Sequence, residues 1–337
     1  MDKNINEILI VRNDKIGDFI LILPALSWLK KNIPDCKITC IVSTSVSNLA
    51  RQCSHIDNVI VDKPIKYLLK ELSDYNFHIS ISFFSTFRIG YLIKKLNIPI
   101  RIAPKTKLAQ IFYNNKILQN RSNSDKPEYE YNSDLVYELF KILKIDNIKD
   151  MEGAPYLTFK NDSMKQRREI FIEKYNLNPE KKIIFIHPGT GGSSKSLNIE
   201  SFAGICKGLR IFDDYNFIVH YSPEDEQYAR NLKLISGDDL TMRLIEAKID
   251  ISHMLNNISI CDIFMAGSTG PLHVAGALNK KTVGFYPSKK SSTSLRWETI
   301  NNFDKRLSFT GIKKNKDLIG LDMNKTVLDI QRFISSV

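Results

Sequence analysis

The stretch E-I-L-I-V-R-N-D-K-I-G-D-F-I-L-I-L-P-A-L, residues 7–26, joins a β-branched apolar run to a longer apolar pattern of helical character. Gly17 lies at the junction, where the absence of a side chain permits a tight turn or a close backbone approach. Asp18 follows in the expected first turn of a helix, where the helix dipole favours an anion. The pattern predicts one helix from about Gly17 to Lys31, buried against a sheet that holds its first turn in place.

The rest of the chain repeats this alternation of short β-branched runs and longer helical patterns, which is typical of parallel βα units. The runs form two similar sets, so we expect an α/β fold with two Rossmann-like, doubly wound domains and a cleft between them. Ligands of such sheets bind outside the carboxyl ends of the strands. The expected strands cover residues 7–12, 37–42, 58–61, 77–82 and 98–103 in the first set, and residues 182–187, 216–221, 241–245, 262–266 and 282–286 in the second.

A change of domain is expected near residues 150–165, after a polar segment, a helical pattern and a charged stretch. A length of 337 residues fits two domains of ordinary size. We therefore predict domains of residues 1–155 and 156–337, with the last helix packing back on the first domain.

Composition describes a soluble globular protein, with 43% hydrophobic and 25% charged residues. No apolar run reaches the roughly 18 to 20 residues of a membrane span, and the first residues do not resemble a signal peptide, so we expect a cytoplasmic protein. The five cysteines are odd in number and lack C-x-x-C spacing. Buried free thiols are expected rather than disulfides or a zinc site.

The formal net charge of +11 favours a polyanionic partner: nucleic acid, an anionic membrane surface or a phosphorylated substrate. Charge alone does not choose among these partners. Part of the richness in lysine, asparagine and isoleucine is also what an AT-rich genome produces.

Two glycine-rich segments follow expected strands of the second set. H-P-G-T-G-G-S-S-K, residues 187–195, offers backbone N–H groups that can cradle phosphate, and Lys195 adds a positive charge; a flexible surface loop is the alternative. The segment does not match the Walker A motif. G-S-T-G-P-L-H, residues 267–273, predicts a turn into a helix whose N-terminus could bind a diphosphate, with His273 either a ligand or a structural residue.

Three acidic residues also follow strands, and each has two interpretations. Asp18 is either a helix-capping acid or a general base within reach of a substrate hydroxyl. Asp225 and Glu226 are either acids of a helical first turn or ligands of a ribose hydroxyl.

Together these blocks resemble glycosyltransferase family 9, the ADP-heptose:lipopolysaccharide heptosyltransferases, which have a two-domain GT-B fold. The family's opening G-D and L-P-A-L correspond to Gly17, Asp18 and residues 23–26. Its H-P-G-x-G…K loop corresponds to residues 187–195, and its D-[ST]-G-P-x-H block begins here at Ser268. The blocks occur in the family's order over most of the chain.

The resemblance implies an inverting transfer of heptose from ADP-heptose to an inner-core lipopolysaccharide acceptor, with Asp18 as the catalytic base. It assigns donor binding to the second domain. No D-x-D occurs in the chain, and a positive side chain with a helix dipole can stabilise the leaving diphosphate, so we expect neither a metal nor another cofactor. The expected donor ligands are Thr190, Gly191, Lys195, Asp225, Glu226, Ser268, Thr269, Gly270, Pro271 and His273.

The chain departs from the family pattern at two places. Ser268 stands where the family commonly has aspartate, and K-S-L-N replaces K-R-W-P at residues 195–198. The alternative is therefore the same fold acting on another nucleotide sugar, for outer-core, capsule or protein glycosylation. A noncatalytic sugar-nucleotide binder and an RNA-binding protein are further alternatives, although no RNP-like motif is present and we expect no nucleic-acid partner.

The acceptor is expected on the first domain, whose later loops carry several cations that could hold an acidic glycolipid. A solvated basic face is the simpler interpretation for most of them. A basic first domain could also rest on the anionic inner leaflet of the inner membrane. The predicted acceptor ligands are Asp14, Arg88, Arg101 and Lys105.

Overall fold

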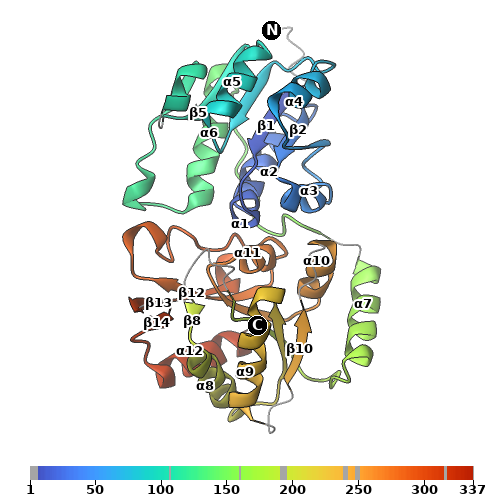
Figure 1. Ribbon diagram of the computed structural model, residues 1–337, viewed down its shortest axis with the longest axis vertical. Coiled ribbons are helices and arrows are strands. Elements are labelled where there is room, and N and C mark those ends of the chain that lie inside the picture. The colour runs from blue at the N-terminus through green and yellow to red at the C-terminus, as the bar shows by residue number, and fades with distance from the viewer. Residues whose placement is uncertain are drawn as a thin grey trace. The chain divides into compact units, whose positions relative to one another are not determined.

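The computed structural model describes residues 7–105, 108–158, 161–189, 196–237, 242–246, 251–314 and 317–336. The chain divides into two compact units, each with its own sheet (Figure 1). The first unit comprises Met1–Arg121 and Lys126–Tyr156, and the second comprises Ser122–Asp125 and Leu157–Val337.

The sheet of the first unit has six strands in the order β3-β2-β1-β4-β5-β6, and neighbouring strands are parallel. This is the order of a doubly wound Rossmann sheet. The five predicted strands are confirmed, whereas the three-residue β6 was not predicted. The strands are β1 (Glu7–Arg12), β2 (Lys37–Val42), β3 (Asn58–Val61), β4 (Ile79–Ser82), β5 (Ile100–Pro104) and β6 (Asn115–Ile117).

Helices cover both faces of this sheet (Figure 1). Apolar residues of α4 and α5 join one core cluster with Leu9 and Val11 of β1, whereas α2 contacts α6. The helices are α1 (Ile16–Ile20), α2 (Leu23–Asn32), α3 (Thr44–Ala50), α4 (Ile65–Leu72), α5 (Phe87–Lys95) and α6 (Glu128–Leu143), with the 3₁₀ turns η1 (Leu108–Phe112) and η2 (Arg121–Asn123).

The prediction of one helix from Gly17 to Lys31 is wrong, because the chain forms α1 and α2 with a break at residues 21–22. Pro24 explains the break. It lacks the N–H that would donate to the carbonyl of Ile20, and its ring would clash with that carbonyl in a continuous helix. Asp18 therefore lies on a separate short helix directly after β1.

The sheet of the second unit repeats the same winding. Its strand order is β10-β9-β7-β11-β12-β13-β14-β8, with parallel pairing from β10 to β13 and an antiparallel β13–β14 pair. The five predicted strands are confirmed, whereas β8, β13 and β14 were not predicted. The strands are β7 (Ile183–His187), β8 (Ser196–Leu197), β9 (Asn216–Tyr221), β10 (Met242–Glu246), β11 (Ile263–Gly267), β12 (Lys281–Pro287), β13 (Arg306–Lys314) and β14 (Asp317–Ile319).

The last helix, α12, packs on α8 within the core of the second unit. Gly208 of α8 allows a close approach, since a Cβ atom there would lie 2.8 Å from Cγ2 of Val327. Packing of α12 on the first domain stays a prediction. The helices of this unit are α7 (Asn161–Lys174), α8 (Ile199–Arg210), α9 (Glu226–Ser236), α10 (Ile251–Ser259), α11 (Gly270–Ala277) and α12 (Met323–Ser335), with the 3₁₀ turns η3 (Pro223–Asp225), η4 (Lys290–Ser292) and η5 (Phe303–Lys305).

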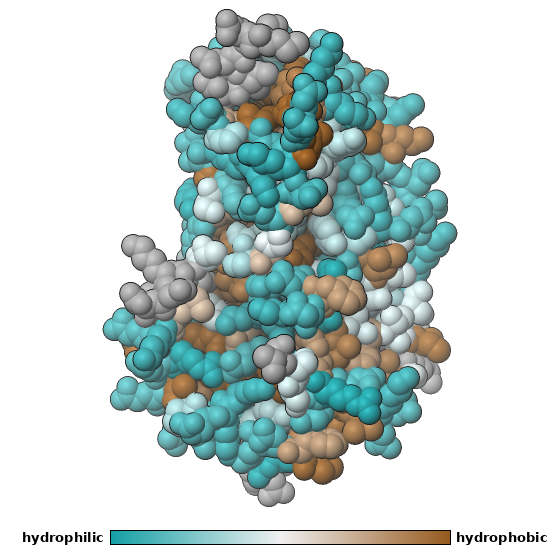
Figure 2. All heavy atoms as spheres, turned by 180° about the vertical axis from the view of Figure 1, so that it is seen from behind, coloured by the Kyte–Doolittle hydropathy of each residue, from teal (hydrophilic) through white to brown (hydrophobic). Residues whose placement is uncertain are grey.

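The exterior is mainly hydrophilic on the face drawn in Figure 2, where hydrophobic side chains form separate patches. All five cysteines are buried free thiols, as predicted. Within the described part of the chain, none of the helices combines the length and apolarity needed to cross a bilayer.

Candidate active site

The first sheet changes its winding direction between β1 and β4, because β2 and β3 lie on one side of β1 and β4 to β6 lie on the other. Ligands of doubly wound sheets bind at such a switch point, outside the carboxyl ends of the strands. Arg12 is the last residue of β1, and Phe83 directly follows β4. Residues 12–18, at and after the end of β1, therefore lie where a ligand of this sheet is expected.

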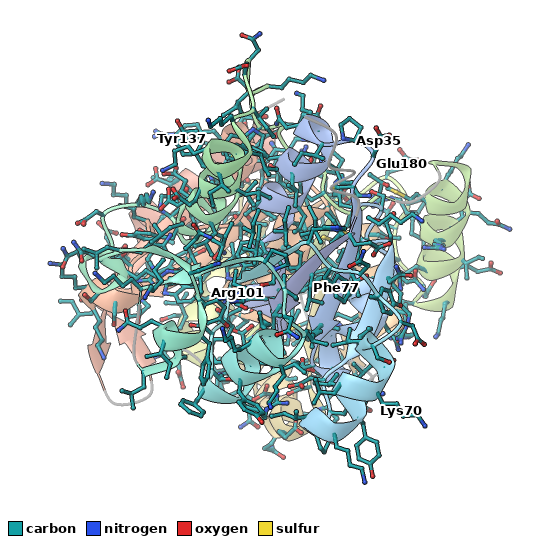
Figure 3. All side chains as sticks on the ribbon, turned by 90° about the horizontal axis from the view of Figure 1, so that it is seen from above. Asp35, Lys70, Phe77, Arg101, Tyr137 and Glu180 are labelled. Atoms are coloured by element: carbon teal, nitrogen blue, oxygen red, sulfur yellow. The ribbon has the colours of Figure 1, made fainter. Side chains whose placement is uncertain are left out.

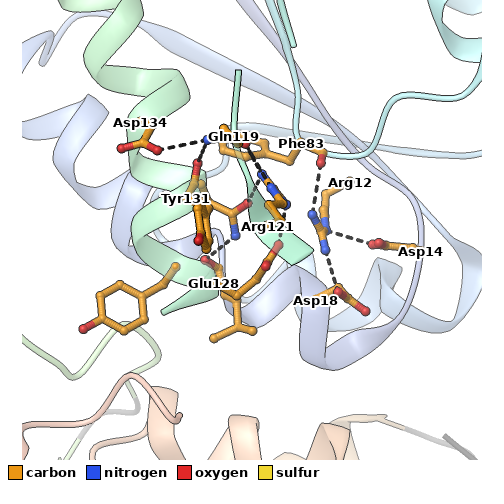
Figure 4. A network of polar contacts seen from close by, with 12 residues as sticks. Arg12, Asp14, Asp18, Phe83, Gln119, Arg121, Glu128, Tyr131 and Asp134 are labelled. Atoms are coloured by element: carbon orange, nitrogen blue, oxygen red, sulfur yellow. Dashed lines mark hydrogen bonds and ion pairs between the residues drawn. The ribbon is translucent and has the colours of Figure 1, made fainter. Parts of the chain in front are cut away.

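Arg12, Asp14 and Asp18 form an ionic group at this switch point, which we call the Arg12 cluster (Figure 4). The Arg12 side chain is 3% exposed. Its Nη2 donates to Oδ1 of Asp18 at 2.7 Å, its Nε lies 2.9 Å from Oδ1 of Asp14, and its Nη1 donates to the Phe83 carbonyl at 3.1 Å. A buried cation needs partners of opposite charge. The two aspartates supply them, and the anchored guanidinium in turn holds the Asp18 carboxylate in place.

Asp14 is the more buried of the two carboxylates. Burial raises its pKa from 3.8 to about 6; the Arg12 cation lowers it and the Asp18 carboxylate raises it. The main-chain carbonyl of Asp14 accepts a hydrogen bond from Oγ of Ser43 at 2.9 Å, which fixes the loop after β1 to the end of β2. Asp14 therefore holds its proton to a higher pH than an ordinary aspartate does.

Arg88, a predicted acceptor ligand, lies at the same edge of the sheet in the first turn of α5. Its guanidinium pairs with Asp62, directly after β3, and donates to the Lys63 carbonyl at 3.0 Å. Asn13 donates to the same Asp62 oxygen at 2.6 Å. Asp62 thus compensates the charge of Arg88, although the arginine side chain stays 39% exposed.

A second polar network, from η2 and α6, lies beside the Arg12 cluster in Figure 4 and was not predicted. Arg121 pairs with the buried Glu128 and donates to Oε1 of Gln119 at 2.8 and 2.9 Å. Asn132, fully buried, donates to the Leu21 carbonyl at 2.9 Å. That carbonyl lies at the break between α1 and α2, so α6 supports the end of the helix that carries Asp18.

The remaining predicted acceptor ligands lie on β5. Arg101 is near the start of this strand, at the opposite edge of the sheet from Asp18, and its guanidinium donates to the carbonyls of Ile98 and Phe112 at 2.6 and 2.9 Å. Figure 3 labels Arg101 near the middle of the view and Lys70 at its rim. Lys105 directly follows the strand at the edge that holds Asp18, and it is exposed. Lys105 is therefore better placed than Arg101.

In the second unit, the corresponding switch point lies between β7 and β11, and α11 begins there. Thr269 is the N-cap residue of α11 and Pro271 is in its first turn. Oγ1 of Thr269 is buried and makes no hydrogen bond within the described residues. Ser268, Gly270 and Pro271 are partly exposed beside it, and His273 is buried one turn into the helix. The helix start thus presents backbone N–H groups and a hydroxyl, as a diphosphate site requires.

The loop after β7 lies against Asp225, because a Cβ atom on Gly189 would fall 1.8 Å from Oδ2 of that residue. The same oxygen accepts from Oγ of Ser222 at 2.7 Å. Glu226 instead pairs with Arg230 on the surface of α9. Thr190, Gly191 and Lys195 lie outside the described residues.

His187, the last residue of β7, packs as a buried histidine. Its Nδ1 donates to the main-chain carbonyl of His220 at 2.7 Å, because a carbonyl oxygen can only accept. Burial lowers the pKa of His187 and lowers that of His220 well below its ordinary value. Both rings are therefore neutral at physiological pH.

Comparison with known proteins identifies the family. The model of glycosyltransferase family 9 (heptosyltransferase) matches residues 65–322. The chain is 36% identical over 341 residues to a Haemophilus influenzae protein assigned provisionally as a glycosyltransferase, covering 98% of this chain and 97% of the relative. It is 23% identical to lipooligosaccharide heptosyltransferase 2 of Campylobacter jejuni, covering 85% and 82% of the two chains.

Among solved structures, the E. coli ADP-heptose lipopolysaccharide heptosyltransferase II superposes with a TM-score of 0.78 at 14% identity, covering 97% of this chain and 98% of that chain. At this identity the likeness shows the fold alone, and it confirms the predicted GT-B architecture of two doubly wound domains. The family model matches most of the chain, and the Haemophilus influenzae relative is 36% identical over nearly its full length. The chain is therefore a glycosyltransferase and belongs to glycosyltransferase family 9, the heptosyltransferases.

Proposed function

We propose that this enzyme transfers heptose from ADP-heptose to an acidic inner-core lipopolysaccharide acceptor, with inversion and without a metal ion, and that Asp18 is the general base. The position of Asp18 carries the proposal. Its carboxylate lies at the switch point of the first sheet, 2.7 Å from a buried guanidinium that holds it in place. Heptosyltransferases of lipooligosaccharide and lipopolysaccharide among the relatives support the sugar and the acceptor class.

The acceptor hydroxyl must lose a proton as it attacks the sugar, so the base must lie within hydrogen-bond reach of it. In the described residues, the only side-chain hydrogen bond or ion pair of Asp18 is the one from Arg12 to Oδ1. Its other oxygen is the one we assign to the acceptor hydroxyl. Asp14, Arg88 and Lys105 at the same edge are the proposed acceptor contacts.

The donor diphosphate would bind at the start of α11, where Thr269, Gly270 and Pro271 meet β11. The helix N-terminus and the buried Thr269 hydroxyl would stabilise the negative charge that develops on the leaving ADP. Asp225, held against the loop after β7, is better placed for the ribose than Glu226, which is paired on the surface. Thr190, Gly191 and Lys195 complete the proposed donor ligands.

A nucleotide panel and one substitution test this proposal. Thermal shifts with ADP, UDP, GDP, dTDP and CMP should show selective stabilisation by ADP, since a ligand at 100 times its Kd adds about 2.7 kcal/mol. Selective stabilisation by another nucleotide would leave the fold assignment unchanged and show that the donor is not ADP-heptose. This outcome is worth testing because Ser268 stands where the family commonly has aspartate.

Asp18→Asn should retain ADP affinity and lose turnover by about 10²- to 10⁴-fold, the usual contribution of a general base. The matched control is Asp35→Asn, an exposed aspartate that follows α2. Undiminished turnover of Asp18→Asn would remove Asp18 as the base, and binding without turnover in the wild type would indicate a noncatalytic binder.

A further inference from the structure

Residues 75–124 contain no aspartate or glutamate although the whole chain has 37 of them. The same 50 residues contain eight lysines and arginines, so they carry +8 of the formal net charge of +11. This long stretch of one sign runs through β4, α5, β5, η1, β6 and η2, and it concentrates positive charge on one part of the first unit. Asp62 and Glu128, which lie outside this stretch, pair with Arg88 and Arg121, so the exposed lysines carry the charge that would attract an anionic partner.

This basic part also exposes large apolar side chains. Leu108 is 78% exposed, Leu118 is 70% exposed and Ile111 is 66% exposed, on η1 and directly after β6. Phe87 and Tyr91, one turn apart on α5, are 57% and 39% exposed. A single exposed leucine is ordinary, whereas several on neighbouring elements are a feature of interaction sites. We call these five residues the apolar surface. The second unit also exposes Ile211 and Leu234, at 82% and 80%, but there Arg210 and Arg230 pair with Asp214 and Glu226, whereas residues 75–124 contain no acid.

The elements that carry the apolar surface are packed together. Phe112 of η1 contacts the aromatic rings of α5, with ring centroids 4.9 Å from Phe87 and 6.3 Å from Tyr91. Gly90 makes the approach possible, since a Cβ atom there would lie 2.6 Å from Cδ2 of Phe112. Lys95 lies 5.6 Å from the centroid of the Tyr91 ring. α5 and η1 therefore hold the apolar and cationic groups in fixed positions. We call the apolar surface, together with α5, η1 and β6, the platform.

The platform reaches the edge of the sheet that holds the Arg12 cluster only on one side, because Phe112 accepts a hydrogen bond from Arg101 near the start of β5 and Lys95 ends α5. α5 begins after the carboxyl end of β4, η1 follows β5, and Leu118 follows β6. In a parallel sheet these strand ends share one edge with the end of β1, which leads to Asp18. A lipid-anchored acceptor held at this edge would have its anchor beside the start of α5 and Leu118.

We propose that the apolar surface, with the exposed Lys94, Lys95 and Lys116 around it, docks the enzyme on an anionic lipid bilayer. Aliphatic side chains favour a bilayer over RNA, because leucine and isoleucine enter the acyl region but cannot stack on bases. The lysines add electrostatic attraction to anionic headgroups. The choice of a bilayer rests in part on the proposed lipid acceptor, whereas the surface itself does not.

Two variants separate the electrostatic contribution to vesicle binding from the hydrophobic contribution. Lys94→Gln/Lys95→Gln/Lys116→Gln should weaken binding to phosphatidylglycerol-containing vesicles about 100-fold, at about fivefold for each lysine, with the effect lost in 1 M salt. Leu108→Asn/Ile111→Asn should weaken binding at low and high salt alike. The side chains are exposed, so both variants should fold. Lys207→Gln/Lys233→Gln/Lys325→Gln and Ile211→Asn/Leu234→Asn are matched controls from exposed positions of the second unit, and they should bind as the wild type does.

Vesicle co-sedimentation, with pure phosphatidylcholine vesicles and a short RNA as comparison ligands, decides the outcome. Stronger binding to anionic vesicles, weakened only by the two platform variants, supports the proposal. Equal binding to both vesicle types, no loss in the platform variants, or tighter binding to RNA would overturn it. Turnover of a soluble truncated acceptor tests the proposed function separately, because that reaction needs no bilayer and should be unchanged in the platform variants.

Discussion

Replacing Asp14 by asparagine should make the protein more stable at neutral pH. The pKa of Asp14 rises from 3.8 in an exposed chain to about 6 in the folded protein, mainly because the carboxylate is buried. Each pH unit of this difference corresponds to about 1.36 kcal/mol, so ionising Asp14 costs the folded state about 3 kcal/mol. Asparagine resembles the neutral acid in shape and carries no charge. We expect Asp14→Asn to raise the free energy of unfolding by about 2–3 kcal/mol above pH 7.

The sign of the pH dependence follows from proton counting. Between pH 3.8 and about 6 the folded state keeps a proton on Asp14 that the unfolded state releases, so this residue makes stability fall as pH rises. Below pH 3.8 both states are protonated and the advantage of the variant should vanish. His187 and His220, whose pKa values are lowered, contribute a slope of opposite sign below pH 6.5. Only the difference between variant and wild type isolates Asp14.

Urea denaturation at pH values from 4 to 8 measures this difference. Asp57→Asn, at a half-exposed carboxylate paired with Lys30 on the same unit, is the control and should show no gain. A variant that is less stable than the wild type at pH 8, or a difference that does not grow between pH 4 and 6, would refute the argument that burial dominates at this site.

Three further outcomes follow from specific contacts. Gly189→Ala should lower the free energy of unfolding by about 1–3 kcal/mol through overlap with the Asp225 carboxylate, and adding Asp225→Ala should restore it in a double-mutant denaturation cycle. Asn132→Leu should cost about 1–3 kcal/mol in urea, because the buried Leu21 carbonyl loses its donor, and unchanged stability would mean that water replaces it. The five buried cysteines should resist alkylation by iodoacetamide at pH 8 until the chain unfolds, since burial raises the pKa of every one of these thiols; rapid labelling of the native protein, counted by mass spectrometry, would contradict this.

The central strands could be predicted because each is a short, continuous apolar run, which a parallel sheet covered on both faces requires. The strands that were missed carry a weaker signal. β6 has three residues, and β8 has two, so neither forms a run. β13 alternates polar and apolar residues over Arg306–Phe309, a period-two pattern that is typical of a strand. The break between α1 and α2 was also readable, because Pro24 does not fit a helix interior.

The sequence predicted only those features of the site that lie within one continuous segment. Gly17 and Asp18 follow a strand, so their place at the sheet edge could be inferred. Arg12 pairs with Asp18 over only six residues, but the burial of Arg12 could not be inferred, because it depends on Phe83, which follows β4 and lies 71 residues away. The support from α6 left a trace in sequence: Glu128 and Asn132 are polar residues on the same helical stripe as the buried Leu135 and Leu139.

Burying the charges of the Arg12 cluster costs desolvation free energy, so their presence at the end of β1 needs a functional explanation. Replacing a buried ionic group by apolar residues of similar size is often neutral or stabilising, so stability alone does not explain a buried arginine with two carboxylates. If the cluster serves the reaction, the Asp14→Asn variant should be more stable and yet at least tenfold lower in kcat/KM, with a smaller loss than Asp18→Asn. A variant that gains stability and keeps full activity would show that Asp14 is dispensable for transfer. Asp18 and its buried arginine would then be the functional part of the cluster.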